Sequence, residues 1–130
     1  MRKSCIKNLF LKDNHKNFYL ISANSTTEIN LKETGKAYNI KGLRFADATL
    51  LKQYLEVQPG SVTPLALIND TTESVTMILD SHVLEQKHIQ IHPLQNDTTI
   101  VIKPDDLLTF LKSINRSYGI YNFDTNEIVL

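Results

Sequence analysis

Short apolar runs, each bounded by turn-forming residues, are the feature that most constrains the fold of this chain. Runs of this kind predict strands rather than long helices. The first two runs, residues 6–12 and 17–22, are separated by the turn-rich tetrapeptide Asp-Asn-His-Lys at 13–16. We therefore predict a β-hairpin at the start of the chain.

The rest of the chain alternates between strand signals and short helical patterns. Strands are predicted at residues 43–46, 65–68, 75–79, 88–92 and 98–102, with weaker strand signals from 119 to 130. Helices are predicted at residues 48–55, after an Asp47 cap, and at 30–38 and 104–114, with a helical turn near 83–86. Because hairpins and meanders outnumber crossover units, the predicted fold class is α+β. It has a mixed, largely antiparallel sheet of about six to seven strands and about three packed helices.

Length and composition predict one folded domain. The chain has 130 residues, of which 42% are hydrophobic and 22% charged, so a single domain over residues 1–130 is expected. Cys5 is the only cysteine, which excludes an internal disulfide and favours a reducing compartment. No stretch approaches the roughly 20 apolar residues of a membrane span, and the basic start lacks the apolar segment of a signal peptide. We expect a cytoplasmic protein that does not enter a membrane.

Charge is balanced over the whole chain but not along it. There are 14 basic and 14 acidic side chains, which excludes a strongly basic nucleic-acid coat. Residues 1–56 carry ten Lys and Arg against five Asp and Glu, a net charge of +5, and residues 57–130 carry a net −5. This asymmetry is compatible with a local surface that faces an anion, and also with an ordinary solvated face.

Standard catalytic and metal motifs are absent from the sequence. There is no nucleophile elbow, P-loop, Gly-x-Gly-x-x-Gly or Cys-x-x-Cys. His88 and His92 are four residues apart but lie in an alternating pattern that predicts a strand, and no acidic or cysteine ligand accompanies them at metal-site spacing. Cys5 is more typical of an inert small hydrophobe than of a nucleophile. We predict no metal site and no cofactor.

Three other features have the chemistry of a binding or reaction site. Lys7 stands among apolar residues of a predicted strand, where a buried cation needs an anion or a carbonyl oxygen; the alternative is a solvated strand face. Two prolines bracket the loop at 59–64, in which Gly60 allows close approach or positive φ and three following amides are free to donate. His92 begins a polar corner after a predicted strand, a common place for functional side chains and for ordinary turns.

Four segments together resemble the YbaK/ProX family of aminoacyl-tRNA editing domains. They are residues 7–11 (Lys-Asn-Leu-Phe-Leu), 43–46 (Leu-Arg-Phe-Ala), 59–70 (Pro-Gly-Ser-Val-Thr-Pro-Leu-Ala-Leu-Ile-Asn-Asp) and 92–97 (His-Pro-Leu-Gln-Asn-Asp). The chain is most similar to the free-standing branch related to the editing insertion of bacterial prolyl-tRNA synthetase. The resemblance runs from Lys7 to about Leu111. Four segments in order and at fitting spacing are more specific than any one of them.

The resemblance implies a pocket for the 3′ end of a tRNA and hydrolysis of the ester that links a wrong amino acid to it. For this branch the implied substrate is alanine on proline tRNA. The implied catalytic residue is Lys7. The implied substrate-binding residues are Asn8, Gly60, Ser61, Val62, Thr63, Pro64 and His92. The implied partner is the acceptor end of the aminoacylated tRNA, with prolyl-tRNA synthetase as a candidate second partner.

Six residues precede Lys7, whereas family members carry roughly 40 more at this end, so the domain is expected to be N-terminally short. Two alternatives to the alanine deacylase remain open at this point. One is the same fold acting on cysteine attached to proline tRNA. The other is a non-catalytic module that binds tRNA or a synthetase.

Overall fold

A single sheet of eight strands organises the computed structural model, which describes residues 4–91 and 99–130. The strands are β1 (Ser4–Lys12), β2 (Phe18–Asn24), β3 (Arg44–Phe45), β4 (Val75–Asp80), β5 (Ile89–Ile91), β6 (Ile100–Ile102), β7 (Tyr118–Asn122) and β8 (Glu127–Ile128). The α-helices are α1 (Leu31–Ala37), α2 (Ala48–Leu55), α3 (Ser81–Leu84) and α4 (Pro104–Ser113), and the 3₁₀ helices are η1 (Pro59–Ser61) and η2 (Pro64–Asn69). Within the described ranges, no helix is long and apolar enough to span a bilayer.

The sheet runs in the order β6-β5-β1-β2-β4-β7-β8, and β3 also pairs with β1. The predicted hairpin is confirmed: β1 and β2 pair antiparallel from Ile6↔Asn24 to Lys12↔Phe18. Between described strands, four of the seven pairings are antiparallel, and β1–β5, β2–β4 and β4–β7 are parallel. The predicted α+β class with a mixed sheet is therefore confirmed. Two of the eight strands, β3 and β8, are only two residues long.

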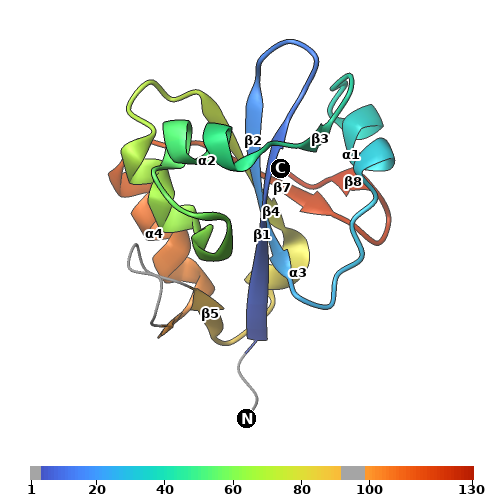
Figure 1. Ribbon diagram of the computed structural model, residues 1–130. Coiled ribbons are helices and arrows are strands. Elements are labelled where there is room, and N and C mark those ends of the chain that lie inside the picture. Colours follow the sequence, from blue (N-terminus) through green and yellow to red (C-terminus); the bar gives the residue numbers. More distant parts are fainter. Residues whose placement is uncertain (1–3, 92–98) are drawn as a thin grey trace.

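Helices cover both faces of this sheet. Figure 1 shows α2 and α4 on one side of the central strands and α1 on the other. Adjacent residues of β1 accordingly enter different cores: Phe10 packs in the larger cluster with α2 and α4, and Leu11 in a smaller cluster next to α1. Successive side chains of a strand point to opposite faces, so a strand covered on both faces has apolar residues in succession. This is why the strands appear in the sequence as short apolar runs.

One predicted element has a different structure. Residues 65–68 were expected to form a strand, but they lie in the 3₁₀ helix η2. Pro64 is the first residue of this helix, a position that favours proline. The Thr63 side chain caps the helix by accepting a hydrogen bond from the Leu65 amide. Ala66 and Leu67 are still buried, now against the larger core. An apolar run this short does not by itself distinguish the two structures.

Asp13 organises the turn between β1 and β2. Its carboxylate accepts hydrogen bonds from the backbone amides of His15 and Asn17, from the Asn17 side chain and from the Tyr19 hydroxyl. Burial alone would raise the pKa of Asp13, but these hydrogen bonds outweigh it and lower the pKa to about 2. The carboxylate is thus stabilised in its charged form in the folded protein.

We expect Asp13→Asn to lower the free energy of unfolding by about 2 kcal/mol at neutral pH. Because the folded pKa lies below the unfolded value of 3.8, this stabilisation is complete above about pH 4 and is lost as the pH falls towards 2. Urea unfolding of both proteins between pH 2 and pH 7 measures it. A stability difference that stays constant across that range would contradict the assigned pKa.

Candidate functional site

The middle of β1 has no described strand partner on one of its edges. On one edge, β1 pairs with β5 through Ser4 and Cys5 and with β3 through Leu11 and Lys12. In the described pairings, the residues between Cys5 and Leu11 pair with neither β5 nor β3 on this edge. Lys7 and Asn8 lie in this part, and by strand alternation they point to opposite faces of the sheet. The part of β1 without a described partner on this edge therefore carries two of the predicted site residues.

Asn8 connects β1 to the predicted loop at residues 60–64. Its side-chain amide donates a hydrogen bond to the Val62 carbonyl at 3.1 Å, and its side-chain oxygen accepts one from the Ser22 hydroxyl at 2.5 Å. Ser22 lies opposite Asn8 in β2 and is fully buried. The structure thus brings Asn8 and the loop together and fixes the side chain of Asn8 from both ends.

The loop itself differs in two ways from the sequence-based expectation. The amide of Ser61 is not free, because it donates to the carbonyl of Gln58 at 2.9 Å and closes the η1 turn. Gly60 does not have positive φ, and a Cβ built there would meet nothing within 4 Å. Gly60 is therefore needed neither for the backbone conformation nor for packing within the protein. Ser61, Thr63 and Pro64 are buried, and the exposed edge of the loop is at Gly60.

Lys7 is half-buried and its amino group is held by backbone. Nζ donates to the carbonyl of Thr27 at 2.5 Å, which meets the expectation of a cation paired with a carbonyl oxygen. The Thr27 hydroxyl in turn donates to Oδ2 of Asp80 at 2.6 Å, and the amide of Asn24 donates to the same oxygen at 3.1 Å. Asp80 is fully buried at the end of β4. The position of the Lys7 amino group is thus tied, through Thr27, to the centre of the sheet.

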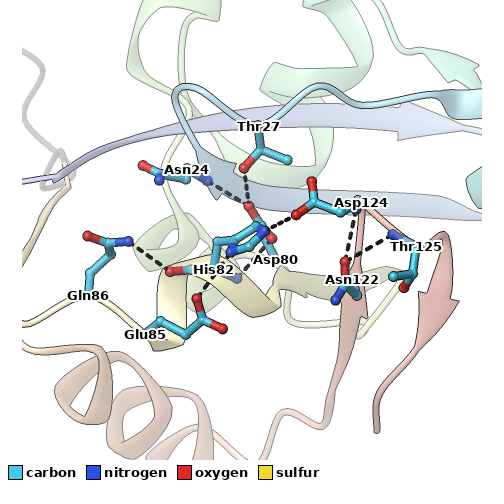
Figure 2. Close-up of polar contacts among 9 residues, drawn as sticks. All are labelled: Asn24, Thr27, Asp80, His82, Glu85, Gln86, Asn122, Asp124 and Thr125. Carbon is cyan, nitrogen blue, oxygen red and sulfur yellow. Dashed lines mark hydrogen bonds and ion pairs between the residues drawn. The ribbon is translucent and has the colours of Figure 1, made fainter.

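Figure 2 shows this arrangement around Asp80 and the histidine beside it. The second oxygen of Asp80 caps α3 by accepting from the His82 amide at 3.0 Å. The His82 ring lies between Asp124, at 2.6 Å, and Glu85, at 3.1 Å. The hydrogen bond with Asp124, then that with Glu85, raises the pKa of His82. Thr27 and Asp80 were not predicted as part of the site; the available signal was that Asp80 directly follows the apolar run of β4.

Cys5 and His92 were also considered in the sequence analysis as candidate reactive or binding residues. Cys5 is exposed, and its thiol contacts the side-chain oxygen of Gln90 at 3.5 Å. His92 lies outside the described residues. Across the part of the chain that the structure describes, no group of three or more His, Cys, Asp and Glu side chains is placed to hold a metal ion.

Comparison with known proteins identifies the family of this chain. The family model described as the aminoacyl-tRNA editing domain matches residues 2–110. The chain belongs to the aminoacyl-tRNA editing domain family. The resemblance to YbaK/ProX proteins is therefore confirmed.

Three relatives show how similar this chain is in sequence to known proteins. The chain is 42% identical to the human protein named putative prolyl-tRNA synthetase associated domain-containing protein 1, over 91% of this chain and 72% of that one. It is 39% identical to the zebrafish (Danio rerio) protein of that family name, of which it spans only 65%. It is 30% identical to the prolyl-tRNA editing protein ProX of Acetoanaerobium sticklandii, over 87% of this chain and 70% of that protein.

The crystal structure of a putative trans-editing enzyme for prolyl-tRNA synthetase matches with a TM-score of 0.73 over 91% of this chain and 68% of that chain. Their sequence identity is 16%, so this likeness supports the fold alone.

Proposed function

We propose that this domain is a trans-editing deacylase that hydrolyses alanine from mischarged Ala-tRNA(Pro). The observation that carries the proposal is the Asn8 side chain, which joins the strand bearing Lys7 to the loop at 60–64. Membership of the aminoacyl-tRNA editing family supports the reaction class. The name of the ProX relative supports proline tRNA as the carrier.

Alanine on proline tRNA is an error that a synthetase has difficulty in avoiding. Alanine is smaller than proline, and the missing methylene groups provide only about 1–3 kcal/mol of discrimination. A second site can hydrolyse the mischarged tRNA if it admits the small alanine side chain and excludes the larger proline ring. The loop at 60–64, fixed by its prolines and by Asn8, is suited to form one wall of such a site. His92 is proposed as a further wall residue on the resemblance alone.

An activated ester requires no protein nucleophile. In the proposed reaction, water attacks the ester carbonyl, the carbon–oxygen bond to the terminal ribose breaks, and free alanine and the ribose hydroxyl are the products. A neighbouring ribose hydroxyl of the terminal adenosine assists the attacking water. The ammonium group of Lys7 has three donors, one of which is used at Thr27, so it retains donors for the negative charge that develops on the carbonyl oxygen.

Release of labelled amino acid from charged tRNA tests the proposal. The domain should hydrolyse Ala-tRNA(Pro) well above the spontaneous rate and spare Pro-tRNA(Pro). Faster hydrolysis of Cys-tRNA(Pro) than of Ala-tRNA(Pro) would replace the proposed specificity by the cysteine alternative. Hydrolysis of none of the three, by protein that still binds tRNA, would favour a non-catalytic module.

Gly60→Ala separates a binding role of the loop from a structural one. Because a Cβ at this position meets no protein atom within 4 Å, we expect the free energy of unfolding to change by less than about 1 kcal/mol. If the substrate ester lies against this edge, the added methyl group displaces it, and kcat/KM for Ala-tRNA(Pro) should fall by about tenfold or more.

Gly42→Ala is the matched control, since Gly42 has a φ of +76° and a Cβ there would lie 2.3 Å from the Asn14 side chain. That variant should lose stability. Unchanged kcat/KM in folded Gly60→Ala protein would show that the substrate does not approach this edge.

A further inference from the structure

A groove between α1 and the segment before β3 is lined by three lysines. It encloses about 440 Å³. Its lining includes Lys32, Lys36 and Lys41, all exposed, and the half-buried apolar residues Leu31, Ile40 and Leu43. No acidic residue is among the described residues that line it. Part of the positive charge of residues 1–56 is thus gathered in one concave place.

The backbone of this groove is held in place by specific contacts. The Ile40 amide donates to the Gly35 carbonyl at 2.7 Å, and a Cβ at Gly35 would lie only 3.0 Å from the Ile40 carbonyl oxygen. On the other side, the Asn14 amide donates to the Lys41 carbonyl at 3.0 Å, and the Arg44 guanidinium donates to the Asn14 side chain at 2.7 Å. The lysines therefore project from a framework that is fixed before any ligand binds.

We infer that this groove binds the phosphate backbone of RNA, and that it is where the acceptor stem of the tRNA contacts the domain. The inference rests on the proposed function for the identity of the RNA. Three lysines line the groove with no acidic residue among its described lining, and they match the charge of successive phosphates. Lys36 is the only one with a described ion pair, to Glu33 at 3.8 Å, and an exposed pair of this kind is easily exchanged for a phosphate.

The position of the groove fits this role. β3, which follows the groove in the chain, pairs with β1 at Leu11 and Lys12. These residues are four to five positions along β1 from Lys7, or about 15 Å at the usual rise of a strand. A stem held in the groove can therefore place its single-stranded 3′ end near Lys7.

A neighbouring hollow limits the RNA path. It shares Leu31 with the groove, carries Glu28 and Asp124, and has no basic residue among its described lining. Phosphate groups are repelled from that side, so the part of the stem remote from the 3′ end is expected to leave the groove towards Lys41. The contrast between the two hollows also provides a control, because removal of Glu28 or Asp124 charge should not weaken RNA binding.

Binding of uncharged tRNA(Pro) by fluorescence anisotropy tests the inference without requiring catalysis. The variant Lys32→Gln/Lys36→Gln/Lys41→Gln should bind at least about tenfold more weakly, and the slope of log K against log salt should fall by about 2–3. The matched control is Lys87→Gln/Lys103→Gln/Lys112→Gln, which removes the same charge from exposed lysines elsewhere. Circular dichroism is measured on both variants to establish that each is folded.

Equal losses in the two triple variants, or no loss in either, would overturn the inference. So would binding of a poly-glutamate peptide through the groove lysines without binding of tRNA, because the partner would then be an acidic protein. In deacylation, the ratio of kcat/KM for Ala-tRNA(Pro) to that for an alanyl ester of the CCA trinucleotide should fall in the groove variant. If neither ester is hydrolysed but tRNA still binds through the three lysines, the proposed function fails and the groove assignment stands.

Discussion

Replacing Lys7 by alanine is expected to lower the rate of Ala-tRNA(Pro) deacylation by about 10²–10³, the usual effect of removing one oxyanion donor. The protein should remain folded, because the substitution removes a single hydrogen bond, from the amino group of the half-buried Lys7 to the Thr27 carbonyl. Single-turnover release of labelled alanine measures the rate, and urea unfolding measures the stability.

Lys12→Ala is the matched control for this experiment. Lys12 is a half-buried lysine on the same strand, five positions further along and next to β3. It should retain the wild-type rate on a short alanyl ester, which does not extend to that end of β1. A Lys7→Ala protein that is folded and hydrolyses Ala-tRNA(Pro) at the wild-type rate would remove Lys7 from the mechanism.

The largest loss of stability is expected at Arg116. Its guanidinium lies 2.8 Å from a carboxylate oxygen of Asp70, and the two side chains are only 6% and 1% exposed. It also donates to the backbone carbonyls of Asp70 and Val75, while the Asp70 carboxylate accepts from the amides of Ser74 and Val75. This network joins the end of η2, the start of β4 and the segment between α4 and β7.

Arg116→Leu leaves the Asp70 carboxylate buried without its cation, which should lower the free energy of unfolding by about 3–5 kcal/mol. Urea or thermal unfolding at neutral pH measures the change. Lys36→Leu is the internal comparison, since it breaks an exposed ion pair with Glu33 whose side chains are 65% and 42% exposed. That variant should lose at most about 0.5 kcal/mol. Similar losses in both variants would show that burial of the Asp70–Arg116 pair does not matter.

Elements with strong local signals could be predicted from the sequence. The turn residues at 13–16 and the flanking apolar runs predicted the β1–β2 hairpin, in which strand pairing is local. Asp47 was predicted to cap α2, and its side chain accepts from the Leu50 amide. Pro104 begins α4 as expected, with Asp105 and Asp106 in the first turn. Each of these structures is formed by residues close together in the sequence.

The family could also be predicted, because four separate segments carry its pattern in order. The residues nominated for the site were Lys7, Asn8, the loop at 60–64 and His92. The structure brings Asn8 and the loop together through the Val62 carbonyl, 54 positions further along the chain. For Lys7 the sequence left open an anion, a carbonyl oxygen or a solvated strand face, and in the structure its amino group donates to the carbonyl of Thr27.

Only the tertiary structure decided what depends on distant segments. The parallel order β2-β4-β7 and the pairing of Asp70 with Arg116 join parts of the chain that carry no local signal for one another. The same is true of the hydrogen bond from Thr27 to Asp80 and of the one from Lys7 to the Thr27 carbonyl, which also join distant segments. Local propensity determines whether a segment can form a turn, a cap or a strand. Burial and hydrogen bonding across the assembled sheet determine which of these side chains meet, and hence where Lys7, Asn8 and the lysines of the groove lie.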